Sequence, residues 1–179
     1  MQRWERLFGD LEAQLAESEL GELRVEVADR TRRELARLRL ADRLRAAHGQ
    51  ALAVRASGEV IVRGTERGSG HDWLLLAEPS GAETVLPLAA LVQVTGLGQR
   101  ASVPGSEGRV AGRLGLGYAL RGIARDRAHV VVILTDGSML DGTIDRVGAD
   151  HLDLTRHLPG PGGSVTVTFR GLAAVRRSA

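Results

Sequence analysis

The 179-residue sequence contains no cysteine, no lysine and no asparagine, and only 3% of its residues are aromatic. Without cysteine it can form neither a disulfide nor a thiolate metal site, as expected in a reducing cytoplasm. With so few aromatics, the core must consist of leucine, valine and alanine. Because lysine is absent, all 24 residues counted as lysine or arginine are arginine, a bias typical of a GC-rich genome. Because the net charge is only +2, only local clusters of arginine can indicate nucleic-acid binding.

Length and hydropathy limit the class of the protein. Hydrophobic residues make up 43% of the chain, which is enough for one ordinary domain or two small ones. No apolar run reaches the roughly 18 residues that a transmembrane helix needs, and the amino-terminal stretch is an acidic amphipathic segment rather than a signal peptide. We therefore expect a cytoplasmic protein with no membrane partner.

Residues 1–49 predict a helical hairpin. Five apolar residues of the first segment recur at helical spacing: Trp4, Leu7, Phe8, Leu11 and Leu15. A second helix is predicted from about residue 18 or 22 to His48, with Gly49 as its stop. The local charge is −3 over residues 1–21 and +3 over residues 22–45. An acidic helix that folds back on a basic one would form an arm for a protein partner or a second copy of the chain, and nucleic-acid binding by the basic helix is the alternative.

Residues 50–95 and 113–179 predict two small β-units, because short β-branched runs alternate there with glycine-containing turns. A linker rich in Gly, Ser and Pro separates them over 96–112, and residues 113–127 predict a helix before the second unit. The two units share positions in order: Gly58 with Gly137, Gly64-Thr65 with Gly142-Thr143, and Asp72-x-Leu74-x-Leu76 with Asp150-x-Leu152-x-Leu154. We interpret this correspondence as a tandem repeat.

Two motifs of the second unit resemble the signatures of the Sm-like (LSm) family. They are Val132-x-Leu134-x-x-Gly137 with Gly142 and Asp150-x-Leu152-Asp153-Leu154, and Phe169-Arg170-Gly171-Leu172. The resemblance implies an α+β protein, in which the N-terminal helical hairpin is followed by two Sm/SH3-like five-stranded antiparallel β-barrels. It also implies RNA binding at His151, Asp153, Arg170 and Gly171. The family usually has asparagine where this chain has Asp153, and an ionised carboxylate can only accept hydrogen bonds.

The densest basic segment lies between the two units. Residues 109–127 contain five arginines and one aspartate. This segment supplies further candidate contacts to phosphate: Arg113, Arg121, Arg125 and Arg127. Its glycines do not form a dinucleotide loop, since no strand precedes them and no acidic residue stands where the ribose would need one.

No catalytic constellation is evident, and we predict no enzyme, no metal and no cofactor. The pairs His71-Asp72 and Asp150-His151 are neighbours on strands, so their side chains point to opposite faces. His151 and Asp153 share a face, but no third metal ligand is evident. Three further aspartates cluster around turns, where turn capping is the simpler interpretation: Asp136, Asp141 and Asp145.

The leading prediction is a non-enzymatic cytoplasmic module that binds RNA or a nucleic-acid machine. The alternative is a protein-interaction scaffold, which includes a homo-oligomer. The whole chain also resembles proteins of high-GC bacteria sometimes labelled Fis-type transcriptional regulators, which implies a DNA-binding regulator as a third alternative. A basic groove on the folded surface would favour the first prediction, and evenly mixed charge would favour the scaffold.

Overall fold

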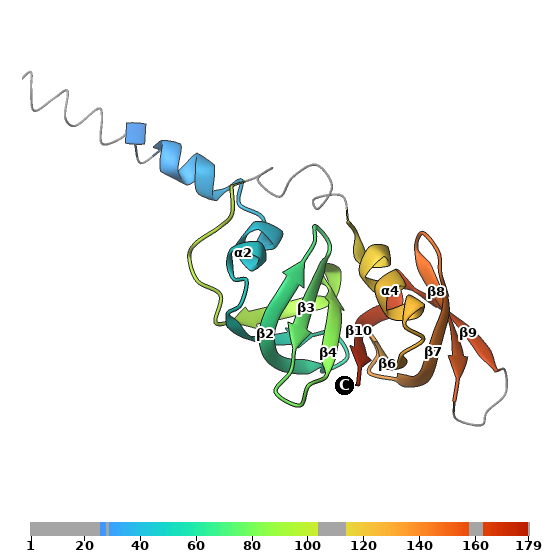
Figure 1. Cartoon of the computed structure of the whole chain (residues 1–179). Helices are drawn as coiled ribbons and strands as arrows, with labels where there is room; N and C mark the ends of the chain where they lie inside the picture. The colour runs from blue at the N-terminus through green and yellow to red at the C-terminus, as the bar shows by residue number, and fades with distance from the viewer. Residues whose placement is uncertain (1–25, 28, 104–113, 158–162, 179) are drawn as a thin grey trace, which may run out of the picture. The chain divides into compact units, whose positions relative to one another are not determined.

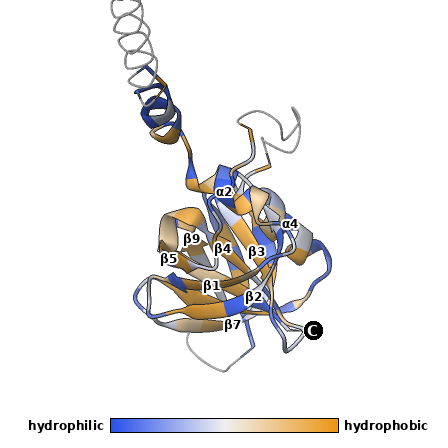
Figure 2. Cartoon of the chain, turned by 90° about the vertical axis from the view of Figure 1, so that its left-hand side faces the viewer, coloured by the Kyte–Doolittle hydropathy of each residue, from blue (hydrophilic) through white to orange (hydrophobic). Residues whose placement is uncertain are grey.

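A computed structural model describes residues 26, 27, 29–103, 114–157 and 163–178 of the chain (Figure 1). The chain divides into two compact units, Met1–Leu38 and Arg39–Ala179. In the first unit, the described residues 26, 27 and 29–35 are helical and largely hydrophilic (Figure 2). An ion pair of 3.3 Å between Arg30 and Glu34, one helical turn apart, lies on its surface. The apolar face predicted over residues 4–15 lies outside the described residues.

The helical hairpin predicted for residues 1–49 is wrong in the part that the structure describes. Instead of continuing to His48, the first helix ends at Leu35. Residues 36–39 are not helical, and a separate helix, α2, spans Leu40–Ala46. A capping contact marks the start of α2, because the Asp42 carboxylate accepts a hydrogen bond from the backbone N–H of Arg39 at 3.2 Å. Gly49, with φ of 76°, follows α2 and leads into the first strand.

Arg39–Ala179 is built on one ten-stranded antiparallel sheet. The first β-unit contributes β1 (Ala51–Ala56), β2 (Ile61–Ser69), β3 (Trp73–Ala77), β4 (Glu83–Pro87) and β5 (Leu91–Thr95). After α4 (Leu116–Arg125), the second β-unit contributes β6 (His129–Leu134), β7 (Met139–Val147), β8 (His151–Arg156), β9 (Ser164–Thr168) and β10 (Leu172–Arg177). The 3-10 turns η1 (Leu88–Ala90) and η2 (Phe169–Gly171) precede the last strand of each unit. The strand order is β5-β1-β2-β3-β4-β10-β6-β7-β8-β9.

The prediction of two five-stranded barrels is therefore wrong. To close the first barrel, β4 would have to pair with β5. Instead β4 pairs with β10 of the second β-unit, where Val85 lies opposite Val175. At the other end, β9 pairs with β8 and with no further described strand. The apolar run of β10 fits this inner position, since Leu172, Ala173, Ala174 and Val175 are each at most 1% exposed.

Two hydrophobic cores lie against this sheet. One joins α2 to β1–β4, and the other joins α4 to β6–β10. The two central strands contribute to both, because Ala173 and Ala174 of β10 pack in the first core while Val85 of β4 packs in the second. Each core therefore includes residues from a strand of the other β-unit. Helices that could cross a membrane are not found among the described residues.

The two β-units follow the same strand order, with the last strand beside the first. They also repeat the same backbone contacts. Two pairs of equivalent hydrogen bonds all measure 2.9 Å: Gly70 N–H to Trp73 O with Gly148 N–H to His151 O, and Ser57 N–H to Ala90 O with Thr135 N–H to Gly171 O. The register of the first two strands, with Leu52 opposite Gly64 and Val130 opposite Gly142, aligns Gly58 with Asp136, so the predicted match of Gly58 with Gly137 is off by one residue. The tandem repeat stays a prediction.

Candidate nucleic-acid interface

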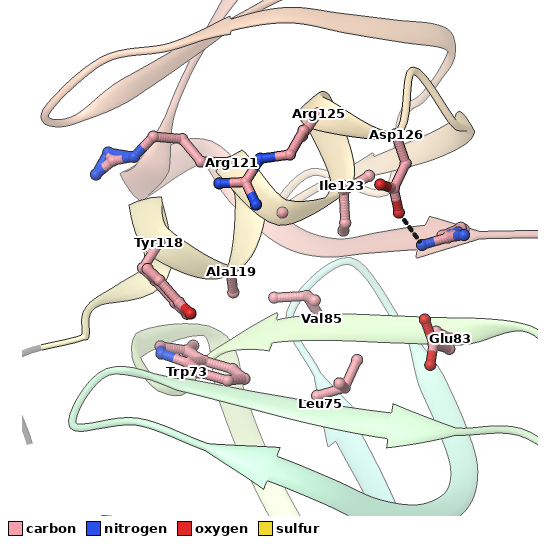
Figure 3. Close-up of a pocket in the computed structure, with 12 residues that line it drawn as sticks. Trp73, Leu75, Glu83, Val85, Tyr118, Ala119, Arg121, Ile123, Arg125 and Asp126 are labelled. Carbon is pink, nitrogen blue, oxygen red and sulfur yellow. Dashed lines mark hydrogen bonds and ion pairs between the residues drawn. The ribbon is translucent and has the colours of Figure 1, made fainter. Parts of the chain in front are cut away.

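A groove of about 450 Å³ opens between α4 and the strands β3 and β4 (Figure 3). Apolar atoms of Trp73, Leu75 and Val85 line its strand side, and Ala119 and Ile123 line its helix side. Polar side chains complete the lining: Tyr118, Arg121 and Arg125 from α4, with Glu83, Asp126 and Arg177. The groove therefore combines an apolar floor with a charged rim.

Trp73 is held in one orientation at the floor of the groove. Its indole Nε1 donates a hydrogen bond to the backbone carbonyl of Leu114 at 2.8 Å. Gly70 leaves room for the ring, since a Cβ there would collide with Nε1 of Trp73 and lie 2.6 Å from the Leu114 oxygen. The side chain of Tyr118, 54% exposed, points from α4 toward Trp73 (Figure 3). Two of the five aromatic residues of the chain thus line this groove.

The sequence of α4 decides which of its side chains reach the groove. Its apolar stripe, Leu116, Leu120 and Ile123, is buried in the second core. Tyr118, Arg121 and Arg125 follow one another at spacings of three and four residues, so they form a second stripe on the exposed side. The ring of Tyr118 points into the groove, and the two arginines lie along its helix edge with their guanidinium groups on the solvent side of α4 (Figure 3).

The charges around the groove are unevenly compensated. Arg177 pairs with Asp126, with 2.8 Å between Nη1 and Oδ2. Arg121 and Arg125 are exposed and make no ion pair or hydrogen bond with any residue in the described part of the chain. With Glu83 as the remaining acid, the lining carries three arginines against two acids. Of the three arginines that line the groove, the two that lack a partner among the described residues both belong to α4.

The structure brings together only part of the predicted basic segment. Arg121 and Arg125 line the groove, whereas Arg113 lies outside the described residues. Arg127 follows α4 with φ of 51° and does not line the groove. Its Nη1 lies 3.9 Å from Oδ1 of Asp145.

The four residues drawn from the Sm-like resemblance lie around β8, β9 and η2, away from the lining of the groove. His151 Nδ1 lies 2.9 Å from Oδ1 of Asp150, and Thr166 donates to Asp153 at 2.7 Å. The hydrogen bond with His151, and to a smaller extent the charge of Arg170, lowers the pKa of Asp150 below its ordinary value. The N–H of Gly171, the fourth of these residues, donates to the hydroxyl of Thr168 at 3.3 Å. Two carboxyl groups, those of Asp150 and Asp153, therefore lie at this second candidate site.

Sequence reasoning missed both aromatic residues of the groove. The stripe of Tyr118, Arg121 and Arg125 follows from helical spacing alone. Trp73 lies beside this stripe only through the packing of α4 on the first β-unit, which no local pattern reveals.

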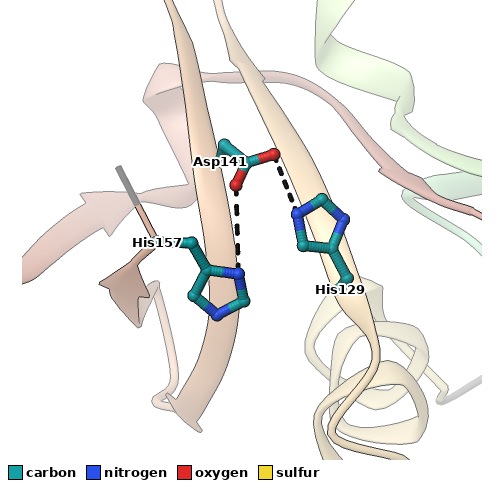
Figure 4. A group of neighbouring side chains, drawn as sticks. All are labelled: His129, Asp141 and His157. Atoms are coloured by element: carbon teal, nitrogen blue, oxygen red, sulfur yellow. Dashed lines mark ion pairs between the residues drawn. The ribbon is translucent and has the colours of Figure 1, made fainter. Parts of the chain in front are cut away.

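Sequence reasoning also missed a cluster on the second β-unit, where His129, Asp141 and His157 converge (Figure 4). Asp141, interpreted as a turn residue, lies within β7.

A scan against known protein-family models finds no match for this chain, and a search of the curated proteins finds no similar one. Its function is therefore inferred from the residues of the groove.

Proposed function

We propose that this chain is a non-enzymatic module that binds single-stranded RNA in the groove between α4 and the strands β3 and β4. The observation that carries the proposal is a fixed indole and an exposed tyrosine in a groove that is also lined by Arg121 and Arg125, which have no partner in the described part of the chain. Bases stack on aromatic side chains with modest dependence on sequence, while arginines bind the backbone phosphates. In this arrangement a base would lie against Trp73 and Tyr118, and phosphates would lie near Arg121 and Arg125.

The shape and chemistry of the groove support a single strand over a duplex. Its volume falls within the roughly 300–1,000 Å³ of sites that hold a small ligand, so one nucleotide fits. Its floor is apolar and aromatic, which suits the exposed face of an unstacked base rather than a paired helix. Asp126 is already neutralised by Arg177, so it opposes phosphate less than its charge alone would.

We place the RNA in this groove rather than beside His151 and Arg170 because of the neighbouring carboxylates. Asp150 and Asp153 both carry a carboxyl group there, and a carboxylate repels phosphate. The lowered pKa of Asp150 keeps its charge in place well into the acidic range. Base contacts by His151 and Arg170 remain a prediction of the Sm-like resemblance.

A protein partner is the second candidate, favoured by strand β5. This strand lies at one end of the sheet order, and Val92 on it is 63% exposed. An edge strand with an apolar side chain offers unpaired backbone groups to a strand of another chain. Such a partner would bind without any need for Arg121 or Arg125.

Fluorescence anisotropy with short labelled RNA and DNA oligomers tests the proposal. We expect binding to single-stranded RNA at low salt that weakens steeply as salt rises. The double variant Arg121→Glu with Arg125→Glu should abolish it, and Tyr118→Ala should weaken it by about five- to a hundredfold, the effect of losing one stacked base. The matched control is Arg55→Glu, which reverses an exposed arginine on β1 outside the groove.

Three results would overturn the proposal. They are no binding of wild-type protein at high micromolar concentration, an equal loss of affinity in Arg55→Glu, and unchanged affinity in the double variant. Tighter binding to single-stranded DNA than to RNA would move the proposal to a DNA-binding module. Light scattering of the same samples reports whether copies associate, as the alternative requires.

A further inference from the structure

Three strands of the second β-unit bring His129, Asp141 and His157 to one face of the sheet. His129 lies opposite Thr143, two residues after Asp141 in β7, and alternate residues of a strand share a face. His157 directly follows β8, and its backbone N–H donates to the carbonyl of Asp141 at 3.1 Å. Because Val130 and Val132 of β6 point into the core, this face is the outer one.

The side chains converge on the carboxylate of Asp141 (Figure 4). Nε2 of His129 lies 2.9 Å from Oδ2, and Nδ1 of His157 lies 3.9 Å from Oδ1. One ligand atom from each residue lies within 4.8 Å of the other two. Tetrahedral zinc with bonds of roughly 2.0–2.2 Å places its ligand atoms about 3.4 Å apart, between the two distances to Asp141.

A neighbouring hydroxyl orients one of the histidines. Oγ1 of Thr143 lies 2.9 Å from Nε2 of His157. When Nε2 carries the proton and donates it to this hydroxyl, the lone pair of Nδ1 faces Asp141. A hydrogen bond on the far nitrogen of a metal-binding histidine is the usual device that sets its tautomer and ring orientation.

We propose that His129, Asp141 and His157 bind one divalent transition-metal ion of the zinc class. Two imidazoles and one carboxylate favour zinc and its neighbours over magnesium or calcium, which prefer oxygen ligands. Three protein ligands leave one tetrahedral position for water or an external ligand. The side chains of the three residues are 45%, 30% and 44% exposed, so the ion reaches the site directly from solvent.

This site is independent of the proposed RNA groove. None of its three residues lines that groove, and its strands are β6, β7 and the end of β8. The bound ion would link these three strands. Loss of RNA binding and loss of metal binding are therefore separate outcomes.

The test is titration of the full chain, freed of any histidine tag, with Zn²⁺ alone in a calorimeter. We expect one Zn²⁺ per wild-type chain, a rise in thermal midpoint on binding, and the visible bands of four-coordinate Co²⁺ when cobalt replaces zinc. Asp141→Asn keeps the size of the side chain and should weaken zinc binding at least tenfold. His157→Ala should do the same, and Thr143→Val should weaken it about ten- to a hundredfold through the orientation of His157.

The matched control is His71→Gln. This histidine also lies beside a carboxylate, 3.6 Å from Asp72, but has no third ligand among the described residues. Its zinc affinity should equal that of wild type. No zinc binding by wild type at micromolar concentration, or an equal loss in His71→Gln, would show that the cluster is only a histidine–aspartate ion pair. Circular dichroism checks the fold of each variant, and His129→Gln replaces any variant that does not fold.

Discussion

The carboxylate of Asp72 accepts a hydrogen bond from the backbone N–H of Leu116 at 2.8 Å, which fastens the first turn of α4 to the first β-unit. Gly115, the residue before the helix, has no side chain with which to cap it. Asp72 supplies the acceptor from another part of the chain, and its negative charge suits the positive end of the helix dipole. The same contact holds the first turn of α4, which carries Tyr118, beside Trp73.

Asp72→Ala should therefore destabilise the protein and lower its affinity for RNA in the groove. By analogy with the loss of a helix cap, the free energy of unfolding should fall by about 1 kcal/mol. Asp72→Asn keeps an acceptor oxygen and should lose less. Urea denaturation measures both variants. Equal stability of Asp72→Ala and wild type would show that α4 does not depend on this cap.

Leu120 and Tyr118 separate stability from binding on the same helix. Leu120 is fully buried in the second core, so Leu120→Ala should lower the free energy of unfolding by about 2–5 kcal/mol. Tyr118 is 54% exposed, so Tyr118→Ala should change stability by about 0.5 kcal/mol or less while reducing RNA affinity. Chemical denaturation and anisotropy on the two variants check this. A large loss of stability in Tyr118→Ala would mean that the ring is structural.

The strands were predictable from sequence because their signals are local. The run from Trp73 to Leu76 is flanked by turn residues and forms β3, and the same holds for the apolar run that forms β6. Whether each β-unit closes into a barrel or joins one continuous sheet was not predictable in this way. Leu172–Val175 would suit either the last strand of a closed barrel or a strand shared between two units. Only the pairing of Val175 with Val85 decides between them.

The residues of the two candidate sites could likewise be predicted only where the signal is local. The stripe of arginines on α4 follows from a helical period of 3.6 residues. His129, Asp141 and His157 come together only when the register of two strand pairs is known, and a shift by one residue would turn Asp141 to the other face. Trp73 requires still more, namely the docking of α4 on a strand of the other unit.

Gly58 is a position where two turns touch. Its φ is 68°, and a Cβ there would lie 2.5 Å from the carbonyl oxygen of Leu134 and 2.9 Å from the amide nitrogen of Gly137. Gly58→Ala should therefore lower the free energy of unfolding by at least about 2 kcal/mol, from left-handed strain and backbone contact. Gly98→Ala is the control, since nothing lies within 4 Å of a Cβ there. Similar thermal midpoints for the two variants would contradict the close approach of the turns.

Asp136 makes the turn between β6 and β7 sensitive to acid. Its Oδ1 accepts hydrogen bonds from the hydroxyl of Ser138 at 2.6 Å and from the backbone N–H of Ser138 at 2.9 Å. The hydroxyl contact first, and then the backbone contact, lowers the pKa of Asp136 below its ordinary value of 3.8. A carboxyl whose pKa is lowered in the folded state stabilises that state above about pH 3.8, and this contribution disappears as the pH falls through the lowered pKa.

Asp136→Ala should thus be less stable than wild type at neutral pH, and the difference should shrink below about pH 3.8 as the wild-type carboxyl becomes protonated. Asp136→Asn separates the charge from the geometry, because its amide oxygen still accepts both hydrogen bonds but does not titrate. It should lie between wild type and the alanine variant at neutral pH and approach wild type in acid. Urea denaturation of the three proteins across this range measures the effect. A difference between wild type and Asp136→Ala that stays constant with pH would show that the carboxylate charge contributes nothing to the turn.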